Sequence, residues 1–260
     1  MTGEAERRPA AQRRPGRRTA RRLGPVPPVA YFAAAGVIVL VAVIITVSVV
    51  LLGDDGHRAA GPATPHAATD GPLPAAYSQA PSTSVFEPIG KRSADLRPLT
   101  AAEVFDTKTV TDADARASLK LTASKVDAQC DAAVWGDRIA GRLQRAGCTQ
   151  ATRGMYADKH FAAMVTIFNL ADANAADRLV AAADPRSGNG FPLPLTGATP
   201  FGHGFSTSRG LAMGHYAVIT WAQRTDGTGD ETDAGLLSLL VAIGHPKALL
   251  VRAAAPGKSG

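Results

Sequence analysis

Residues 149–170 read TQATRGMYADKHFAAMVTIFNL, and the predicted fold is built outward from this stretch. The segments Thr149–Tyr156 and Phe161–Leu170 are rich in residues that favour strands, and the polar segment Ala157–His160 separates them. Two such segments joined by a short polar turn are typical of a β-hairpin. The sequence therefore predicts an antiparallel pair of strands at the centre of the folded part.

Helical patterns lie on both sides of this hairpin along the chain. Residues 131–146 place apolar side chains on one face and arginines on the other before a glycine, which predicts an amphipathic helix. The apolar residues are Trp135, Ile139 and Leu143, and the basic ones are Arg138, Arg142 and Arg145. Two further helices are predicted from Asn174 to Pro185 and over residues 236–243, and Thr100-Ala-Ala-Glu103 has the capping-box pattern of a short one.

The remaining strands complete the predicted fold class. Residues 119–123 alternate at period two, residues 211–222 are apolar on both faces, and residues 248–251 suit an edge strand. The order strand, helix, strand, strand, helix, strand, helix contains the split βαβ arrangement of ferredoxin-like folds. We therefore expect one α+β domain over residues 96–255, with an antiparallel, ferredoxin-like sheet covered by helices on one face, and a flexible C-terminus over residues 256–260.

An apolar segment near the N-terminus predicts a membrane anchor. No charged residue occurs between Arg22 and Asp54, and residues 29–52 are almost wholly Val, Ile, Leu and Ala. As a helix these residues would extend about 36 Å, enough for a hydrocarbon core of about 30 Å. The segment is too long for a cleaved signal peptide, so the sequence predicts an uncleaved transmembrane signal anchor.

The charges that flank this segment predict its orientation. The chain has a formal net charge of +6, and its first 23 residues account for all of it, with eight arginines against Glu4 and Glu6. Basic residues stay on the cytoplasmic side of a span, so residues 1–28 are expected to be a disordered cytoplasmic tail that contacts anionic lipids. The C-terminal domain is then extracellular. Because the 237 residues after the first 23 sum to no net charge, nucleic acid is not an expected partner.

A spacer is expected between the anchor and the domain. Residues 53–95 are rich in Gly, Pro, Ala, Ser and Thr and contain few large apolar side chains. Such a composition cannot bury enough surface to offset the entropy of folding. The sequence therefore predicts a disordered stalk over these residues.

The two cysteines, Cys130 and Cys148, both lie in the part assigned to the oxidising side of the membrane, which favours a disulfide. An unbroken helix between them would separate their Cα atoms by about 25 Å, which is far too long for that bond. A break at Gly136 or Gly141 would permit it. Two buried thiols and a bond between chains remain the alternatives.

No pattern in the sequence predicts a catalytic, metal or cofactor site. The histidines lack the close spacing of a metal site, and no cofactor motif is present. The Gly- and Pro-rich residues 185–210 predict a long loop, in which Ser206 fails the Gly-x-Ser-x-Gly pattern of hydrolases. Long loops often bind ligands or partners, so His203, Ser206 and Arg209 are the candidate residues of a binding loop.

Three segments of the chain carry a resemblance to known proteins: Cys130-Asp-Ala-Ala-Val-Trp-Gly136, Gly147-Cys-Thr-Gln150 and Arg209-Gly-Leu-Ala-Met-Gly-His-Tyr216. They resemble a group of uncharacterised single-pass membrane proteins of actinobacteria with an extracytoplasmic α+β domain. The resemblance covers the anchor and about residues 96–255, and it implies no activity. The order of elements is also similar to external sensor-like domains of actinobacterial kinases and lipoproteins, which is an analogy of fold alone.

Three functions are compatible with these observations. The first is a non-catalytic interaction or sensor module, held outside the membrane and binding a protein, a wall component or a small ligand. The second is a cell-surface hydrolase that uses residues 201–210. The third is a structural, oligomerising anchor, for which Ala30 and Ala34 supply a small-xxx-small spacing within the span.

Overall fold

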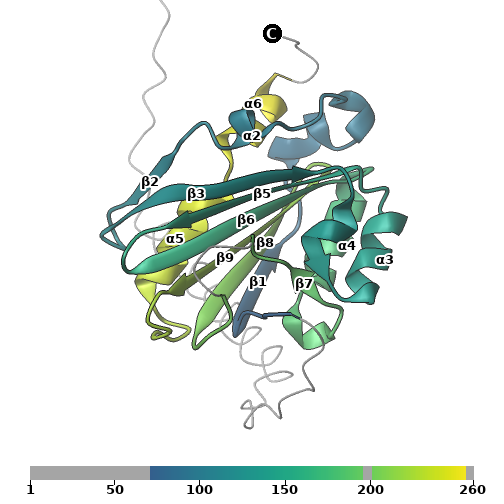
Figure 1. Cartoon of the computed structure of the whole chain (residues 1–260). Coiled ribbons are helices and arrows are strands. Elements are labelled where there is room, and N and C mark those ends of the chain that lie inside the picture. The colour runs from purple at the N-terminus through teal and green to yellow at the C-terminus, as the bar shows by residue number, and fades with distance from the viewer. Residues whose placement is uncertain (1–70, 196–200, 256–260) are drawn as a thin grey trace, which may run out of the picture. The chain divides into compact units, whose positions relative to one another are not determined.

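A seven-stranded sheet organises the residues that the computed structural model describes, 71–195 and 201–255 (Figure 1). The strand order is β1-β8-β9-β6-β5-β3-β2. These strands are β1 (Ala76–Ala80), β2 (Thr109–Asp112), β3 (Ala117–Asp127), β5 (Gln150–Ala157), β6 (Phe161–Asn169), β8 (Ser206–Met213) and β9 (Tyr216–Arg224). All neighbours are antiparallel except β1 and β8. A second, two-stranded sheet joins β4 (Val134–Trp135) to β7 (Phe191–Pro192).

The helices complete an α+β fold, as predicted. The α-helices are α2 (Ala101–Val104), α3 (Asp137–Arg145), α4 (Ala173–Ala182), α5 (Ala234–Gly244) and α6 (Lys247–Ala254). Short 3-10 turns are η1 (Ser84–Ile89), η2 (Arg92–Ala94), η3 (Cys130–Ala133) and η4 (Pro185–Ser187). The Thr100 hydroxyl accepts a hydrogen bond from the Glu103 backbone N–H at the start of α2, which confirms the predicted cap.

The predicted hairpin forms, but the ferredoxin-like order does not. β5 and β6 pair from Gln150↔Asn169 to Ala157↔Ala162. In a split βαβ unit the strands before and after a helix are parallel and separated by another strand. The strands around α4 meet this definition, because β6 and β8 are each antiparallel to β9, which lies between them. The strands around α3 do not, because β3 and β5 are adjacent and antiparallel. The ferredoxin-like prediction was wrong because local order does not fix which strands pair.

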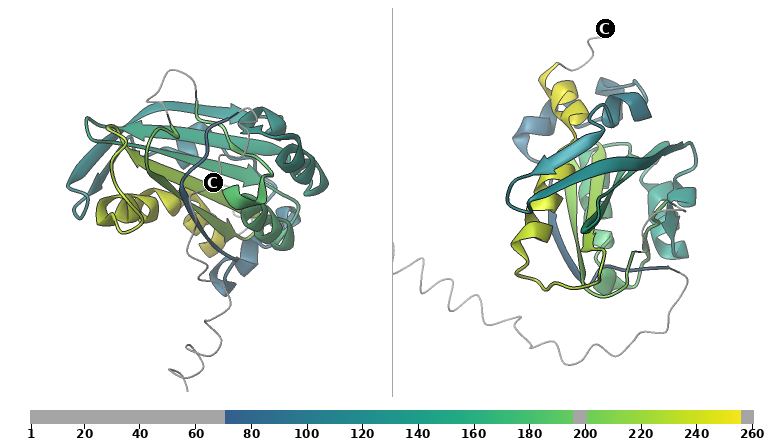
Figure 2. Two further views of the ribbon diagram at one scale, coloured as in Figure 1. Left: turned by 90° about the horizontal axis from the view of Figure 1, so that it is seen from below. Right: turned by 60° about the vertical axis from the view of Figure 1, so that its left-hand side comes forward.

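Helices cover both faces of the sheet, so the prediction that they cover one face was wrong. α5 packs on β6, β8 and β9, whereas α4 packs on β8, β9 and β1. Successive residues of β9 point to opposite faces and enter two separate cores. Tyr216, Val218 and Ala222 lie with α5, and Ala217, Ile219 and Trp221 lie with α4. Figure 2 shows α5 and the α3–α4 pair on opposite sides of the sheet.

Two elements predicted in the C-terminal half of the chain differ from those in the structure. The predicted strand 211–222 is two strands, because Gly214 (φ +62°) and His215 form a tight turn between β8 and β9. The predicted edge strand 248–251 belongs to helix α6. Buried Ala248, Leu249, Arg252 and Ala253 follow helical spacing there. A short apolar run does not by itself distinguish a strand from a buried helix.

The predicted helix over residues 131–146 begins late, and this permits the disulfide. Residues 130–135 form η3 and β4, and α3 starts only at Asp137. Gly136 has φ +91°, and a Cβ there would lie 2.7 Å from the Asn189 carbonyl oxygen, so the chain turns sharply at this residue. The Cα atoms of Cys130 and Cys148 are then 6.3 Å apart, and the two residues are joined by a disulfide.

The folded part begins earlier than the sequence predicted. Residues 71–95, assigned to the stalk, include β1, η1 and η2, and β1 pairs in parallel with β8. Ile89 is fully buried in the core. Few apolar residues are enough here because β1 completes an existing sheet and obtains its hydrogen bonds from β8. The prediction of disorder was therefore wrong for residues 71–95.

The predicted membrane anchor is not among the residues that the structure describes. Residues 29–52, the basic tail and residues 256–260 lie outside the described residues. Within residues 71–195 and 201–255 no single helix has both the length and the apolar character of a membrane span. Taken together α5 and α6 reach that length and composition, but they are bent by 43° at their junction.

Candidate functional site

The three predicted binding residues do not form one site. Ser206 and Arg209 belong to strand β8, not to a loop, and their odd spacing places their side chains on opposite faces of the sheet. Ser206 is fully buried, whereas His203 lies exposed in the turn before the strand. The loop prediction was wrong because Gly and Pro residues ahead of β8 concealed where the strand begins.

The histidines are also dispersed. His160, His203 and His245 are exposed in separate turns, and His215 is fully buried between β8 and β9. The His215 Nδ1 lies 2.7 Å from the Ile89 carbonyl oxygen. Burial lowers the pKa of His215, so this side chain is neutral at pH 7. No group of acidic, His and Cys side chains suited to a metal ion occurs among residues 71–195 and 201–255.

Two buried arginines have complete sets of partners, which identifies them as structural. Arg252 is 2% exposed and forms ion pairs with Asp95 and Glu103, at 2.9 and 2.7 Å. Burial opposes its charge, but these carboxylates hold the pKa of Arg252 above its usual value. On the other face of the sheet Arg153 pairs with Asp127 at 2.6 Å. Neither group is free to bind a ligand.

A different set of arginines lines a groove between α3 and α4. The groove has a volume of about 280 Å³, and its walls are Arg142, Arg145, Ala146, Ala175, Arg178 and Leu179. All three arginines are exposed. No carboxylate forms an ion pair with any of them within the described part of the chain. We call these six residues the arginine groove.

The shape of the arginine groove follows from the two helices. Ile139 and Leu143 bury one face of α3, which directs Arg142 and Arg145, three residues apart, to a shared outer face. Ala146 and Ala175 are small, so the space between the helices stays open above them. Arg178 reaches this space from α4.

The topology of the sheet brings the two helices together. β5 begins just after α3, and its first residue, Gln150, pairs with Asn169 at the end of β6. The chain therefore leaves the β5–β6 hairpin beside the end of α3. The Ala171 backbone N–H then donates to the Ala146 carbonyl at 3.0 Å, directly before α4 begins. The sequence predicted the arginine face of α3 but not the contribution of Arg178, because only the register of the β5–β6 hairpin makes α4 a neighbour of α3.

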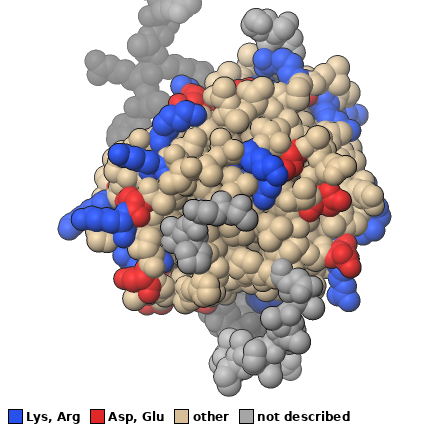
Figure 3. Space-filling model, viewed as in Figure 1, with Lys and Arg blue, Asp and Glu red and all other residues tan. Residues whose placement is uncertain are grey.

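The acidic residues at and within α4 form no ion pair with the arginines of the groove. The Asp172 carboxylate accepts from the Ala175 N–H as the helix cap, and Asp177 accepts from the Ser82 N–H. Charged residues of both signs are spread over the face shown in Figure 3. The arginine groove is thus a local cationic site on a domain without a general charge excess. Converging guanidinium groups are suited to carboxylate or phosphate oxygens.

Comparisons with known proteins add no identity to this geometry. No protein-family model, curated protein or solved structure matches the chain.

Proposed function

We propose that this protein is an interaction module that binds an acidic segment of an extracytoplasmic partner protein in the arginine groove. The observation that supports this function is the convergence of Arg142, Arg145 and Arg178 without a carboxylate partner among the described residues. Three like charges that face one groove repel one another, and acidic groups of a partner relieve that repulsion.

The exposure of the arginine groove favours a protein partner over a small ion. Small-ligand sites enclose most of the ligand in a largely apolar pocket, whereas all three guanidinium groups here are solvent-exposed. A single exposed charge pair contributes only about 0.2–1 kcal/mol, so useful affinity requires several carboxylates at once. An acidic peptide segment supplies them at the spacing of its side chains.

The proposed module is held outside the membrane by residues 29–52, with residues 1–28 in the cytoplasm against anionic lipids. Positive charge before this segment and Asp54 and Asp55 after it support that orientation. The proposed relatives are the uncharacterised actinobacterial membrane proteins that the chain resembles. The hydrolase alternative has no support from Ser206, whose buried hydroxyl has no hydrogen-bond partner among the described residues.

Calorimetric titration of the detergent-purified full chain with a hexaglutamate peptide tests the proposal. We expect binding that weakens as salt is added. Replacing Arg142, Arg145 and Arg178 by Gln should reduce the affinity by roughly 3- to 150-fold, since each of the three lost pairs contributes about 0.2–1 kcal/mol. The matched control is Arg138→Gln, because Arg138 is exposed on α3 but does not line the groove.

Two results would overturn the proposal. One is the absence of hexaglutamate binding by the unaltered protein at low salt. The other is equal affinity of the unaltered protein and the triple variant, which would place any binding elsewhere. Inorganic phosphate serves as the second probe, and tighter binding of phosphate than of hexaglutamate would contradict the choice of a protein partner.

A further inference from the structure

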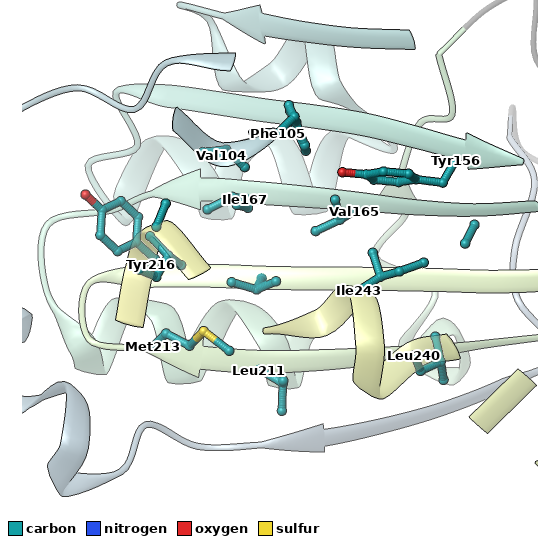
Figure 4. Packing of buried hydrophobic residues seen from close by; sticks show 14 of the residues in the cluster. Val104, Phe105, Tyr156, Val165, Ile167, Leu211, Met213, Tyr216, Leu240 and Ile243 are labelled. Atoms are coloured by element: carbon teal, nitrogen blue, oxygen red, sulfur yellow. The ribbon is translucent and has the colours of Figure 1, made fainter. Parts of the chain in front are cut away.

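The outer face of α5 is uncharged, although surface helices usually place charged residues toward water. No Asp, Glu, Lys or Arg occurs from Ala234 to Pro246. The inner face is fully used, because Leu240 and Ile243 point into the core beside Leu211 (Figure 4). Packing on the sheet therefore does not account for the uncharged outer face, which makes this face a candidate contact surface.

The outer face of α5 has a self-complementary shape. Leu237 and Val241, 45% and 50% exposed, lie four residues apart and form a ridge. Beside them lies a lower row of small residues at the same spacing, Ala234, Ser238 and Ala242. Ala234 and Ala242 are exposed, whereas Ser238 is half-buried and its hydroxyl donates to the Asp112 carboxylate of β2 at 2.7 Å. A ridge of this kind packs into the groove over such a row on a second helix. We call these five residues the α5 face.

The two ends of α5 carry opposite charges. Asp230 and Glu231 precede the helix, Lys247 follows it, and all three are exposed. Glu231 and Lys247 have no hydrogen-bond or ion-pair partner within the described part of the chain. An antiparallel second copy of α5 would place its basic end beside the acidic end of the first copy. At the other end of the contact, its acidic end would lie beside the basic end of the first copy.

We propose that the α5 face binds the α5 face of a second copy of this chain, with the two helices antiparallel about a two-fold axis. Such a contact uses the same surface on both copies. The ridge of each copy therefore packs into the groove of the other, and the acidic end of each α5 lies beside the basic end of the other. A lipid surface fits less well, because helices that lie on anionic lipid carry Lys and Arg, not Asp230 and Glu231.

The size of the α5 face indicates a weak contact that depends on tethering. α5 has 11 residues and a length of about 16 Å, so the contact buries much less than the roughly 800 Å² per partner of a standard interface. This part of the inference rests on the proposed membrane anchor. Residues 53–70 separate that anchor from the described domain, so copies in one membrane meet at a high effective concentration.

Cysteine cross-linking of the full chain in its native membrane tests the contact. The two native cysteines form a disulfide, so a cysteine introduced by Val241→Cys is the one free thiol among the described residues. A short bismaleimide should convert this variant to a covalent dimer. Val126→Cys is the matched control, because Val126 is also exposed and apolar but lies on β3. Thermal unfolding of both variants verifies that they fold.

Charge reversal distinguishes a specific antiparallel contact from chance encounters. In the Val241→Cys background, Glu231→Lys should reduce the cross-linked fraction roughly tenfold, since two symmetry-related pairs of exposed charges change together. Adding Lys247→Glu should restore it. A parallel contact or a lipid-bound helix gives no reason for this rescue.

Three results would overturn the inference: cross-linking of Val241→Cys no stronger than that of Val126→Cys, cross-linking unaffected by Glu231→Lys, or no rescue by the double reversal. Hexaglutamate binding should be unchanged in all these variants, because the arginine groove lies on the opposite side of the sheet. A failed α5 contact is therefore distinguishable from a failed arginine groove.

Discussion

The helices on the two sides of the sheet bury similar faces but present contrasting outer surfaces. α3 buries Ile139 and Leu143 and exposes arginines, whereas α5 buries leucines and an isoleucine and exposes Leu237 and Val241. Packing on the sheet constrains only the buried faces. The exposed faces are free of that constraint, and their difference is the basis of the two contacts we propose: an acidic partner on one side and a second copy on the other.

The largest expected effect is a loss of stability when the buried ion pairs of Arg252 on α6 are removed. Arg252→Ala should reduce the free energy of unfolding by about 3–5 kcal/mol, because it leaves the buried Asp95 carboxylate without its ion pair. Arg145→Ala on the other side should cost less than about 0.5 kcal/mol, since Arg145 is exposed and unpaired among the described residues. Urea unfolding measures both. Equal costs would remove the contrast between paired and unpaired arginines.

The second prediction concerns the disulfide, which holds the end of α3. Replacing Cys130 and Cys148 by Ser should destabilise the protein by about 3 kcal/mol, as expected for opening a loop closed across 18 residues. Local opening should be concentrated in α3, which has only two buried side chains, and hydrogen exchange should speed up there more than in α5. An equal increase of the hydrogen-exchange rates in α3 and α5 would show that the disulfide does not stabilise α3 in particular.

The third prediction is a dependence on pH at the start of α5. The hydrogen bond from the Arg224 guanidinium lowers the pKa of Asp233, and the N–H groups of Gly235 and Leu236 act in the same direction. The ionised carboxylate is therefore stabilising above the usual Asp pKa of about 4, and this contribution is lost as the pH falls through the lowered pKa.

Asp233→Asn should accordingly cost about 1–2 kcal/mol at about pH 7, and the difference from the unaltered protein should shrink as the pH falls through the lowered pKa of Asp233. Unfolding measured across this pH range gives both values. Glu231→Gln is the control, with no change expected in this dependence. A difference that grows on acidification would have the wrong sign for a lowered pKa.

The smallest effects on stability are expected at the two outer surfaces. Val241→Ser and Arg142→Gln should each change the free energy of unfolding by less than about 0.5 kcal/mol, because both side chains are exposed. Their effects on binding should separate: Val241→Ser weakens self-association alone, and Arg142→Gln weakens hexaglutamate binding alone. A variant that weakens both would contradict the assignment of two independent surfaces.

Local sequence chemistry predicted the elements whose signals lie within a few residues. The Thr100 cap, the hairpin over residues 149–170 and the helix that contains residues 236–243 all form as expected. Errors occurred where a neighbour distant in sequence decides the conformation. Gly136 turns the chain against residues 189–190, and residues 76–80 become a strand because β8 supplies their hydrogen bonds.

The candidate sites, like the fold, were predictable from the sequence only where the signal lies within one segment. Sequence alone determined that α3 has a face of arginines and that the segment at α5 is uncharged, because helical periodicity assigns side chains to faces. Only the tertiary structure decided that Arg178 joins Arg142 and Arg145, and that Ser206 and Arg209 point to opposite faces of the sheet. Periodicity is a property of one segment, whereas pairing and register depend on contacts between segments far apart in the chain.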